Sequence, residues 1–136
     1  YALAESSYRA ALAVRRDPAV LNDLAYLLMV RGDAPEEARA LIEEALVLQP
    51  DSPVLLSTRG ELSLRENRLD QAEADLQRVM AAMPDHPQAL LLTAQLYAAR
   101  NQTDAAREMA QALADRQGEL PAEQQAALKK LIEQLP

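Results

Sequence analysis

The sequence predicts an all-α fold, an α-solenoid of antiparallel helix pairs closed by a capping helix at its C-terminal end. Apolar residues make up 49% of the 136, yet Phe and Trp are absent, so the core must consist of many small contacts between closely approaching helices. The 8 prolines stand between apolar segments, where they punctuate helices. The third and deciding observation is an internal repeat with a period near 34 residues.

The repeat becomes visible when the sequence is laid on itself. A shift of 34 superimposes residues of the same type: Pro50 on Pro84, Pro53 on Pro87, Leu56 on Leu90 and Asn67 on Asn101. A shift of 35 brings Pro18 onto Pro53, so the earlier unit has one additional residue, which we place in the turn 32–35. The repeat units are therefore predicted at residues 17–50, 51–84 and 85–118.

Each unit is predicted to contain two helices, one from a proline to a Gly or Asn turn and one from that turn to the next proline. In the middle unit these helices cover roughly residues 53–66 and 69–83. Asp33 stands three residues before Glu36, the spacing of a capping box. Gly118 falls where the third unit should end, and Gly is common just past a helix.

The two ends differ from the units between them. Residues 1–16 match the second helix of a repeat whose first helix is missing, and we expect the chain to be part of a longer protein because it begins at Tyr1. Residues 119–136 are predicted to form an amphipathic capping helix from about Ala122 to Leu135. Its inner face is expected to carry Ala127, Leu128, Leu131, Ile132 and Leu135, and its outer face Glu123, Gln124, Lys129, Lys130 and Glu133.

The pattern of small and large residues resembles the tetratricopeptide-repeat family, and more generally its bacterial members. The matching small positions include Ala25, Gly60 and Ala94 in first helices, and Ala38, Ala72 and Ala106 in second helices. The chain departs from the family consensus where Leu replaces Trp, Arg59 precedes Gly60, Ser63 replaces Tyr, and Ala110 replaces an aromatic residue. The resemblance implies a right-handed superhelix whose first helices line a concave face.

In this family the concave face commonly receives a peptide in extended or helical form. Transferred position by position, the resemblance implies a partner-binding groove made of Asn22, Tyr26, Met29, Ser57, Glu61, Arg65, Gln88, Leu91 and Gln95. Leu91 has an alternative interpretation as packing between helices. The polar members could hydrogen-bond a peptide backbone or pair a charge, and Tyr26 and Met29 could receive an apolar side chain.

Composition and charge narrow the classes of function. The 21 acidic and 14 basic residues give a formal charge of -7, which argues against a nucleic-acid partner. With no Cys and one histidine, His86, in a predicted turn, no metal site or cofactor is expected. No apolar run approaches the roughly 18 residues of a membrane span. Either a bacterial cytoplasm or a periplasm and cell envelope fits this composition.

Three hypotheses about function follow, and none is an enzyme in its own right. The first is a non-catalytic scaffold that binds a protein or peptide segment on the concave face. The second is self-assembly into a homo-oligomer. The third is a recruiting or regulatory domain of a larger envelope, secretion or polysaccharide-export protein.

Overall fold

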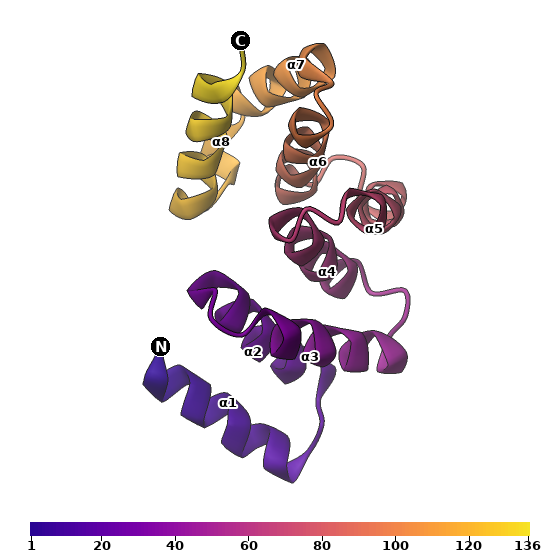
Figure 1. Cartoon of the computed structure of the whole chain (residues 1–136), viewed down its shortest axis with the longest axis vertical. Coiled ribbons are helices and arrows are strands. Elements are labelled where there is room, and N and C mark those ends of the chain that lie inside the picture. Colours follow the sequence, from indigo (N-terminus) through magenta and orange to yellow (C-terminus); the bar gives the residue numbers. More distant parts are fainter.

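The computed structural model describes all residues from 1 to 136 and contains helices without strands (Figure 1). A short 3-10 turn, η1 (Gln117–Glu119), precedes the last helix. The α-helices are α1 (Ala2–Val14), α2 (Pro18–Arg31), α3 (Pro35–Leu48), α4 (Pro53–Arg65), α5 (Leu69–Ala82), α6 (Pro87–Ala99), α7 (Thr103–Ala114) and α8 (Ala122–Gln134).

The helices associate as neighbours in sequence. The pairs α2 with α3, α4 with α5, and α6 with α7 form the most extensive contacts, and each pair packs against the next to make a coiled stack (Figure 1). Helix α1 packs against α2, and α8 packs against α6 and α7. This arrangement confirms the predicted all-α solenoid. Each helix pair lies within one of the three predicted repeat units.

Prolines and capping side chains begin the helices. A proline occupies the first turn of α2, α3, α4 and α6, where its missing N–H costs no hydrogen bond. The Asp17 side chain accepts a hydrogen bond from the Ala19 backbone N–H at 2.8 Å, and the Ser52 hydroxyl accepts one from the Leu55 N–H at 3.4 Å. These caps sit at the entry to the first helices of two pairs.

The turns inside the pairs contain the residues with left-handed backbone. Gly32 (φ 82°), Asn67 (φ 57°) and Asn101 (φ 61°) occupy equivalent places between the two helices of their pairs. Gly and Asn tolerate this region better than other residues, which explains why they recur there. The Gly and Asn turns expected from the repeat are therefore present.

Two local predictions are wrong. Asp33 does not cap α3, because Ala34 is the capping residue and no side chain accepts a hydrogen bond there. The Asp33 carboxylate instead accepts a hydrogen bond from Arg31 at 2.7 Å. Gly118 does not follow directly after a helix either, since α7 ends at Ala114 and Gly118 lies within η1.

The core lies between the helices of each pair and continues from pair to pair. Its largest cluster draws on α1 to α6 and contains leucines such as Leu21 and Leu28 that are 0% exposed. Buried alanines lie between the helices, and Gly60 of α4 lies close to α5. A Cβ atom at Gly60 would lie 3.3 Å from the Leu76 side chain of α5. The small positions of the repeat thus serve helix contact.

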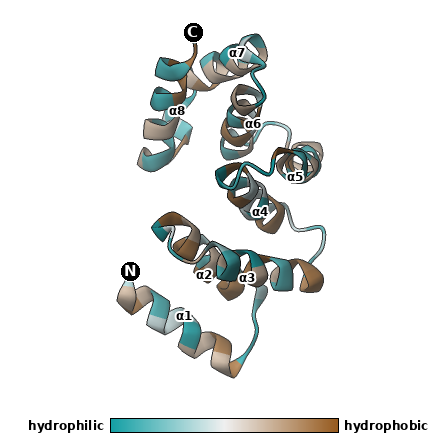
Figure 2. Cartoon of the chain, viewed as in Figure 1, coloured by the Kyte–Doolittle hydropathy of each residue, from teal (hydrophilic) through white to brown (hydrophobic).

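Helix α8 closes the C-terminal end with an apolar face. Leu128 and Leu131 are buried in a cluster with Leu113 and Leu120, whereas Ile132 is 38% exposed and does not belong to the inner face predicted for it. Figure 2 shows the hydrophilic residues of α8 alternating with this apolar face. No helix combines the length and the apolar character that crossing a membrane requires.

Candidate functional site: a furrow along the first helices

Three adjoining hollows lie along the first helices of the pairs, with volumes of about 390, 270 and 250 Å³. Tyr26 of α2 lines all three, and Asn22, Gln88 and Gln124 each line two. The hollows therefore form one continuous surface, here called the furrow, which extends over α2, α4, α6 and the beginning of α8. A surface of this length can contact several consecutive residues of a bound chain.

Eight of the nine residues predicted from the sequence line the furrow. They come from α2, α4 and α6, and they are Asn22, Tyr26, Ser57, Glu61, Arg65, Gln88, Leu91 and Gln95. Leu91 is only 3% exposed and forms part of the floor, where it also packs in the C-terminal core cluster. The packing interpretation of Leu91 is confirmed, and its role in a groove stays a prediction. Contact of these residues with a partner remains a prediction.

Met29 does not belong to the furrow, and its placement there was wrong. The side chain is 4% exposed and packs in the main core cluster. Met29 follows Leu28 and lies on the side of α2 that faces the other helices, one residue away from Val30, which does line the furrow. Because consecutive residues on a helix point about 100° apart, an error of one position exchanges surface for core.

Sequence reasoning missed the contribution of α8. Glu123, Gln124 and Ala127 line the furrow opposite Tyr26, although Glu123 and Gln124 were expected on the outer face of the capping helix. Figure 1 shows α8 folded back beside α6 and α7, on the same side of the coil as the N-terminus. The signal was present, because Gln124 stands four and seven residues before Leu128 and Leu131, on the same helical face.

The furrow has an acidic balance. Glu61, Asp23 and Glu123 line it, and Arg65 is the only arginine or lysine that does so. Arg65 donates a hydrogen bond to Glu61 at 3.1 Å, one turn earlier on α4. Burial raises the pKa of Tyr26, and the negative charges of Glu61 and Glu123 raise it further. Burial also raises the pKa of Asp23, with a smaller contribution from Asp17.

Two side-chain oxygens in the furrow are buried without a hydrogen-bond donor. They are Oδ1 of Asn22 and Oε1 of Gln124, and both residues line the same hollow. Buried polar atoms in proteins are nearly always paired, because leaving one unpaired costs about 1–3 kcal/mol. Both oxygens belong to residues that line the furrow, so N–H groups of a bound molecule could satisfy them if the side chains turn toward it.

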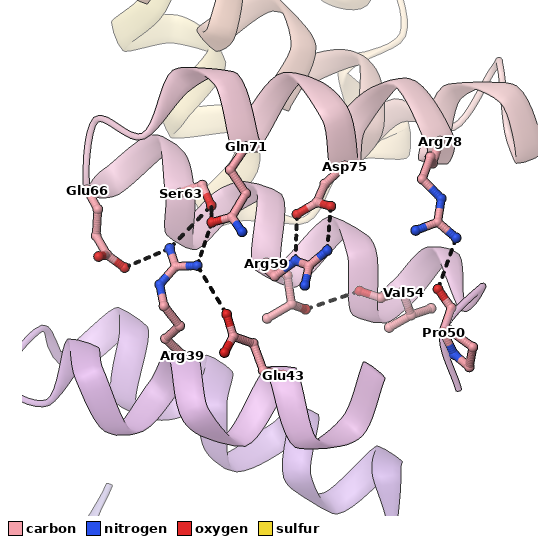
Figure 3. A network of polar contacts seen from close by, with 11 residues as sticks. Arg39, Glu43, Pro50, Val54, Arg59, Ser63, Glu66, Gln71, Asp75 and Arg78 are labelled. Atoms are coloured by element: carbon pink, nitrogen blue, oxygen red, sulfur yellow. Dashed lines mark hydrogen bonds and ion pairs between the residues drawn. The ribbon is translucent and has the colours of Figure 1, made fainter. Parts of the chain in front are cut away.

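A network of polar contacts holds α4 in place from its other face (Figure 3). Arg39 of α3 donates hydrogen bonds to Gln71 of α5 at 2.6 Å, to Glu66 at 3.1 Å and to the buried Ser63 hydroxyl of α4 at 3.3 Å. This network joins two helix pairs. It is inaccessible to sequence reasoning because its members lie 24 to 32 residues apart.

A second polar contact fixes α4 against its own partner helix. Arg59 forms a two-pronged pair with Asp75 of α5, with distances of 2.8 and 2.9 Å, and the Asp75 side chain is 3% exposed (Figure 3). Hydrogen bonding to Asp75 raises the pKa of Arg59, so this charge persists at any ordinary pH. Together the two contacts set the orientation of Ser57, Glu61 and Arg65 on the furrow side of α4.

Comparison with known proteins gives two matches to family models described as tetratricopeptide repeat. One covers residues 63–132, just over half of the chain, and the other covers residues 1–53. The chain belongs to the tetratricopeptide-repeat family. Its departures from the family consensus, Arg59 and Ser63, are members of the polar contacts that join the repeats.

A solved structure agrees with this assignment at the level of the fold. It is a tetratricopeptide repeat protein from Parabacteroides merdae ATCC 43184, with 22% sequence identity and a TM-score of 0.73. The match covers 95% of this chain and 51% of the other, so this tetratricopeptide-repeat chain spans about half the length of that protein. No curated protein sequence matches the chain.

Tetratricopeptide repeats generally mediate interactions between proteins. His86 is exposed at the start of α6. Among the carboxylates of α3, Glu37 pairs with Arg9 of α1, and Glu44 pairs with Arg16, which follows the end of α1. No group of three or more His, Asp or Glu side chains is placed to hold a metal ion.

The tetratricopeptide-repeat stack has another hollow outside the furrow. It measures about 430 Å³ and lies at the junction of α5 with α6 and α7, where Tyr97, Met80 and Met109 line it. It is confined to one junction between repeats, whereas the furrow extends over three helix pairs. The furrow is therefore the candidate partner site.

Proposed function

We propose that the furrow binds an extended or helical segment of a partner protein and that the chain acts as a non-catalytic scaffold. The observation that carries the proposal is the continuity of the furrow from α2 to α8, with an apolar floor and polar walls. Apolar side chains of the segment would rest on Leu91 and Leu64, and its backbone N–H groups would donate to Asn22 and Gln124. The hydrogen bonds of Arg39 hold α4, which contributes to these walls, against α3 and α5.

Selection from a random peptide library displayed on phage tests this proposal directly. The double variant Tyr26→Ala, Glu61→Arg removes an aromatic wall and reverses one charge in the furrow. We expect it to lose the peptides that the unmodified chain selects, with at least a tenfold drop in affinity for the best of them. Circular dichroism should show unchanged helicity.

The matched control changes the same residue types elsewhere. Tyr97→Ala with Glu108→Arg alters the junction hollow and the exposed face of α7 but leaves the furrow intact. This variant should retain the selected peptides. If it loses them while the furrow variant keeps them, the binding surface is the junction between repeats and the proposal is wrong.

Self-assembly is a second candidate, and exposed apolar side chains favour it. Val47 is 81% exposed and Leu48 53% at the end of α3, and Val14 is 89% exposed at the equivalent place on α1. Figure 2 shows the end of α3 as a hydrophobic segment on the outside of the coil. Sedimentation over a hundredfold concentration range tests this idea, and a constant monomer mass would remove it.

A further inference from the structure

The hollow at the N-terminal end of the furrow has an unusual composition. Residues of α1, α2 and the first turn of α8 border it, and Tyr1, Tyr8 and Tyr26 are among them. The chain has only four tyrosines and neither Phe nor Trp, so three of its four aromatic rings of this kind border one hollow of about 250 Å³. Elsewhere Ala and Leu build the core, which makes this concentration of rings a local property.

Two carboxylates border the same hollow from different helices. Asp23 belongs to α2 and Glu123 to α8, and neither forms an ion pair with any residue of the chain. Arg31, at the end of α2, is engaged by Glu5 and Asp33. The hollow therefore contains negative charge that no arginine or lysine of the protein neutralises.

A third element is the buried acceptor described above. Asn22 lines this hollow, and its Oδ1 atom is buried and receives no hydrogen bond. An ammonium group carries three N–H donors and a guanidinium carries five, so either could satisfy that oxygen while facing the carboxylates. The negative charge of Glu123 already acts on the Tyr26 ring, whose pKa is raised by burial and by Glu61 and Glu123.

We propose that this hollow, the cation pocket, binds an arginine or lysine side chain of the segment held in the furrow. Aromatic faces attract cations through the ring quadrupole, and the exposed carboxylates of Asp23 and Glu123 add a modest charge attraction. An organic cation fits better than a metal ion, because three of the eight lining residues are tyrosines and no three carboxylates converge as a metal would require. This inference rests on the proposed function and specifies the partner as a basic segment.

Small probes test the cation pocket without any peptide ligand. N-acetyl-arginine amide and its neutral isostere N-acetyl-citrulline amide are titrated into the chain, with the Tyr1 amino group acetylated so that it does not compete. We expect the arginine probe to shift the ring signals of Tyr8 and Tyr26 in NMR spectra and to bind about tenfold more tightly than citrulline. The ring signals of Tyr97 should stay unchanged.

Charge-neutral variants locate the site. Asp23→Asn with Glu123→Gln should weaken arginine binding about five- to tenfold, since two partly exposed charge attractions are lost. Glu36→Gln with Glu108→Gln removes the same charge from two exposed carboxylates that form no ion pair and do not line the hollow, and it should have little effect. Equal losses in both variants would mean general attraction to an acidic protein and would overturn the site.

The two proposals fail in distinguishable ways. If arginine and citrulline probes bind alike, the cation pocket is wrong whatever the peptide selection gives. If the probes behave as expected but no peptide is selected, the proposed furrow function fails while the pocket stands. Selected peptides without an enrichment in Arg or Lys would overturn the link between the two.

Discussion

The first and last helices, α1 and α8, both lie at an end of the stack with one face covered, yet different forces hold them. Helix α1 buries a single residue, Leu12. Charged hydrogen bonds add to this contact: Arg9 donates to Glu37 of α3 at 2.8 and 2.9 Å, and Arg16, just after α1, donates to Glu44 of α3 at 2.7 and 2.8 Å. Glu5 of α1 also pairs with Arg31 of α2, and the half-buried Tyr8 packs against the core. The N-terminal end therefore combines little apolar burial with several ion pairs.

Helix α8 is fastened by apolar contact. Leu128 and Leu131 are buried against the helices before them, and no side chain of α8 takes part in an ion pair. One solenoid can therefore have one end that is sensitive to salt and acid and another end that is sensitive to the loss of a buried side chain. Salt and acid weaken ion pairs and leave apolar burial largely intact, whereas loss of a buried side chain does the reverse.

The largest effect is expected at α8. Leu128→Ala removes a side chain that is 2% exposed, and it should cost about 2–4 kcal/mol through lost burial and an unfilled cavity. Hydrogen exchange should show the amides of α8 opening while those of α1 stay protected. Ile132→Ala on the same helix is the control and should cost well under about 1 kcal/mol, because its side chain is already partly exposed.

Acid should loosen α1 before α8. Hydrogen bonds from Arg9 and Arg16 lower the pKa of Glu37 and Glu44 below the ordinary glutamate value of 4.5. A lowered folded-state pKa gives stabilisation that is complete above the unfolded value and is lost as the pH falls through the folded value. Between pH 5 and pH 2, backbone NMR signals of α1 should move first. Simultaneous movement of both helices would contradict the comparison.

High salt should destabilise α1 relative to α8, as acid does, but by a smaller amount. Raising NaCl from about 0.01 to 1 M shortens the Debye length from about 30 to 3 Å and screens the exposed pairs of α1. Amide exchange in α1 should accelerate at high salt, with no acceleration in α8. Faster exchange in α8 would mean that charge holds this helix as well.

The smallest effect is expected from removing one exposed pair. Arg16→Gln leaves Glu44 without its partner, but both side chains are solvated and most surface pairs contribute little. Its melting temperature should fall only slightly compared with that of Lys129→Gln, which removes an unpaired charge from α8. A large loss would show that α1 depends on this pair alone.

The fold could be predicted from the sequence because its determinants are local. The prolines that begin α2, α4 and α6, and the Gly or Asn at each inner turn, act within a few residues of their own position. The internal repeat then predicts the order in which first and second helices alternate along the chain. Asp33 shows the limit of this reasoning, since its carboxylate had two possible partners and pairs with Arg31 instead of capping α3.

The site was predicted less completely because it depends on distant segments. The face of α2 that carries Asn22 and Tyr26 followed from the repeat pattern, but Met29 lies one residue outside it. The approach of Glu123 to Tyr26 depends on how far the coil turns over three helix pairs. No spacing within the sequence records that angle.

The position of α8 has a mechanical consequence. The walls of the furrow at Tyr26 and Glu123 belong to the first complete helix pair and to the last helix, so a chain seated between them would act as a strut across the whole coil. Stacked repeats contact only their neighbours and flex by small rotations that add up along the stack. A bound segment would therefore restrict the rotations between neighbouring repeats and fix the pitch of the superhelix.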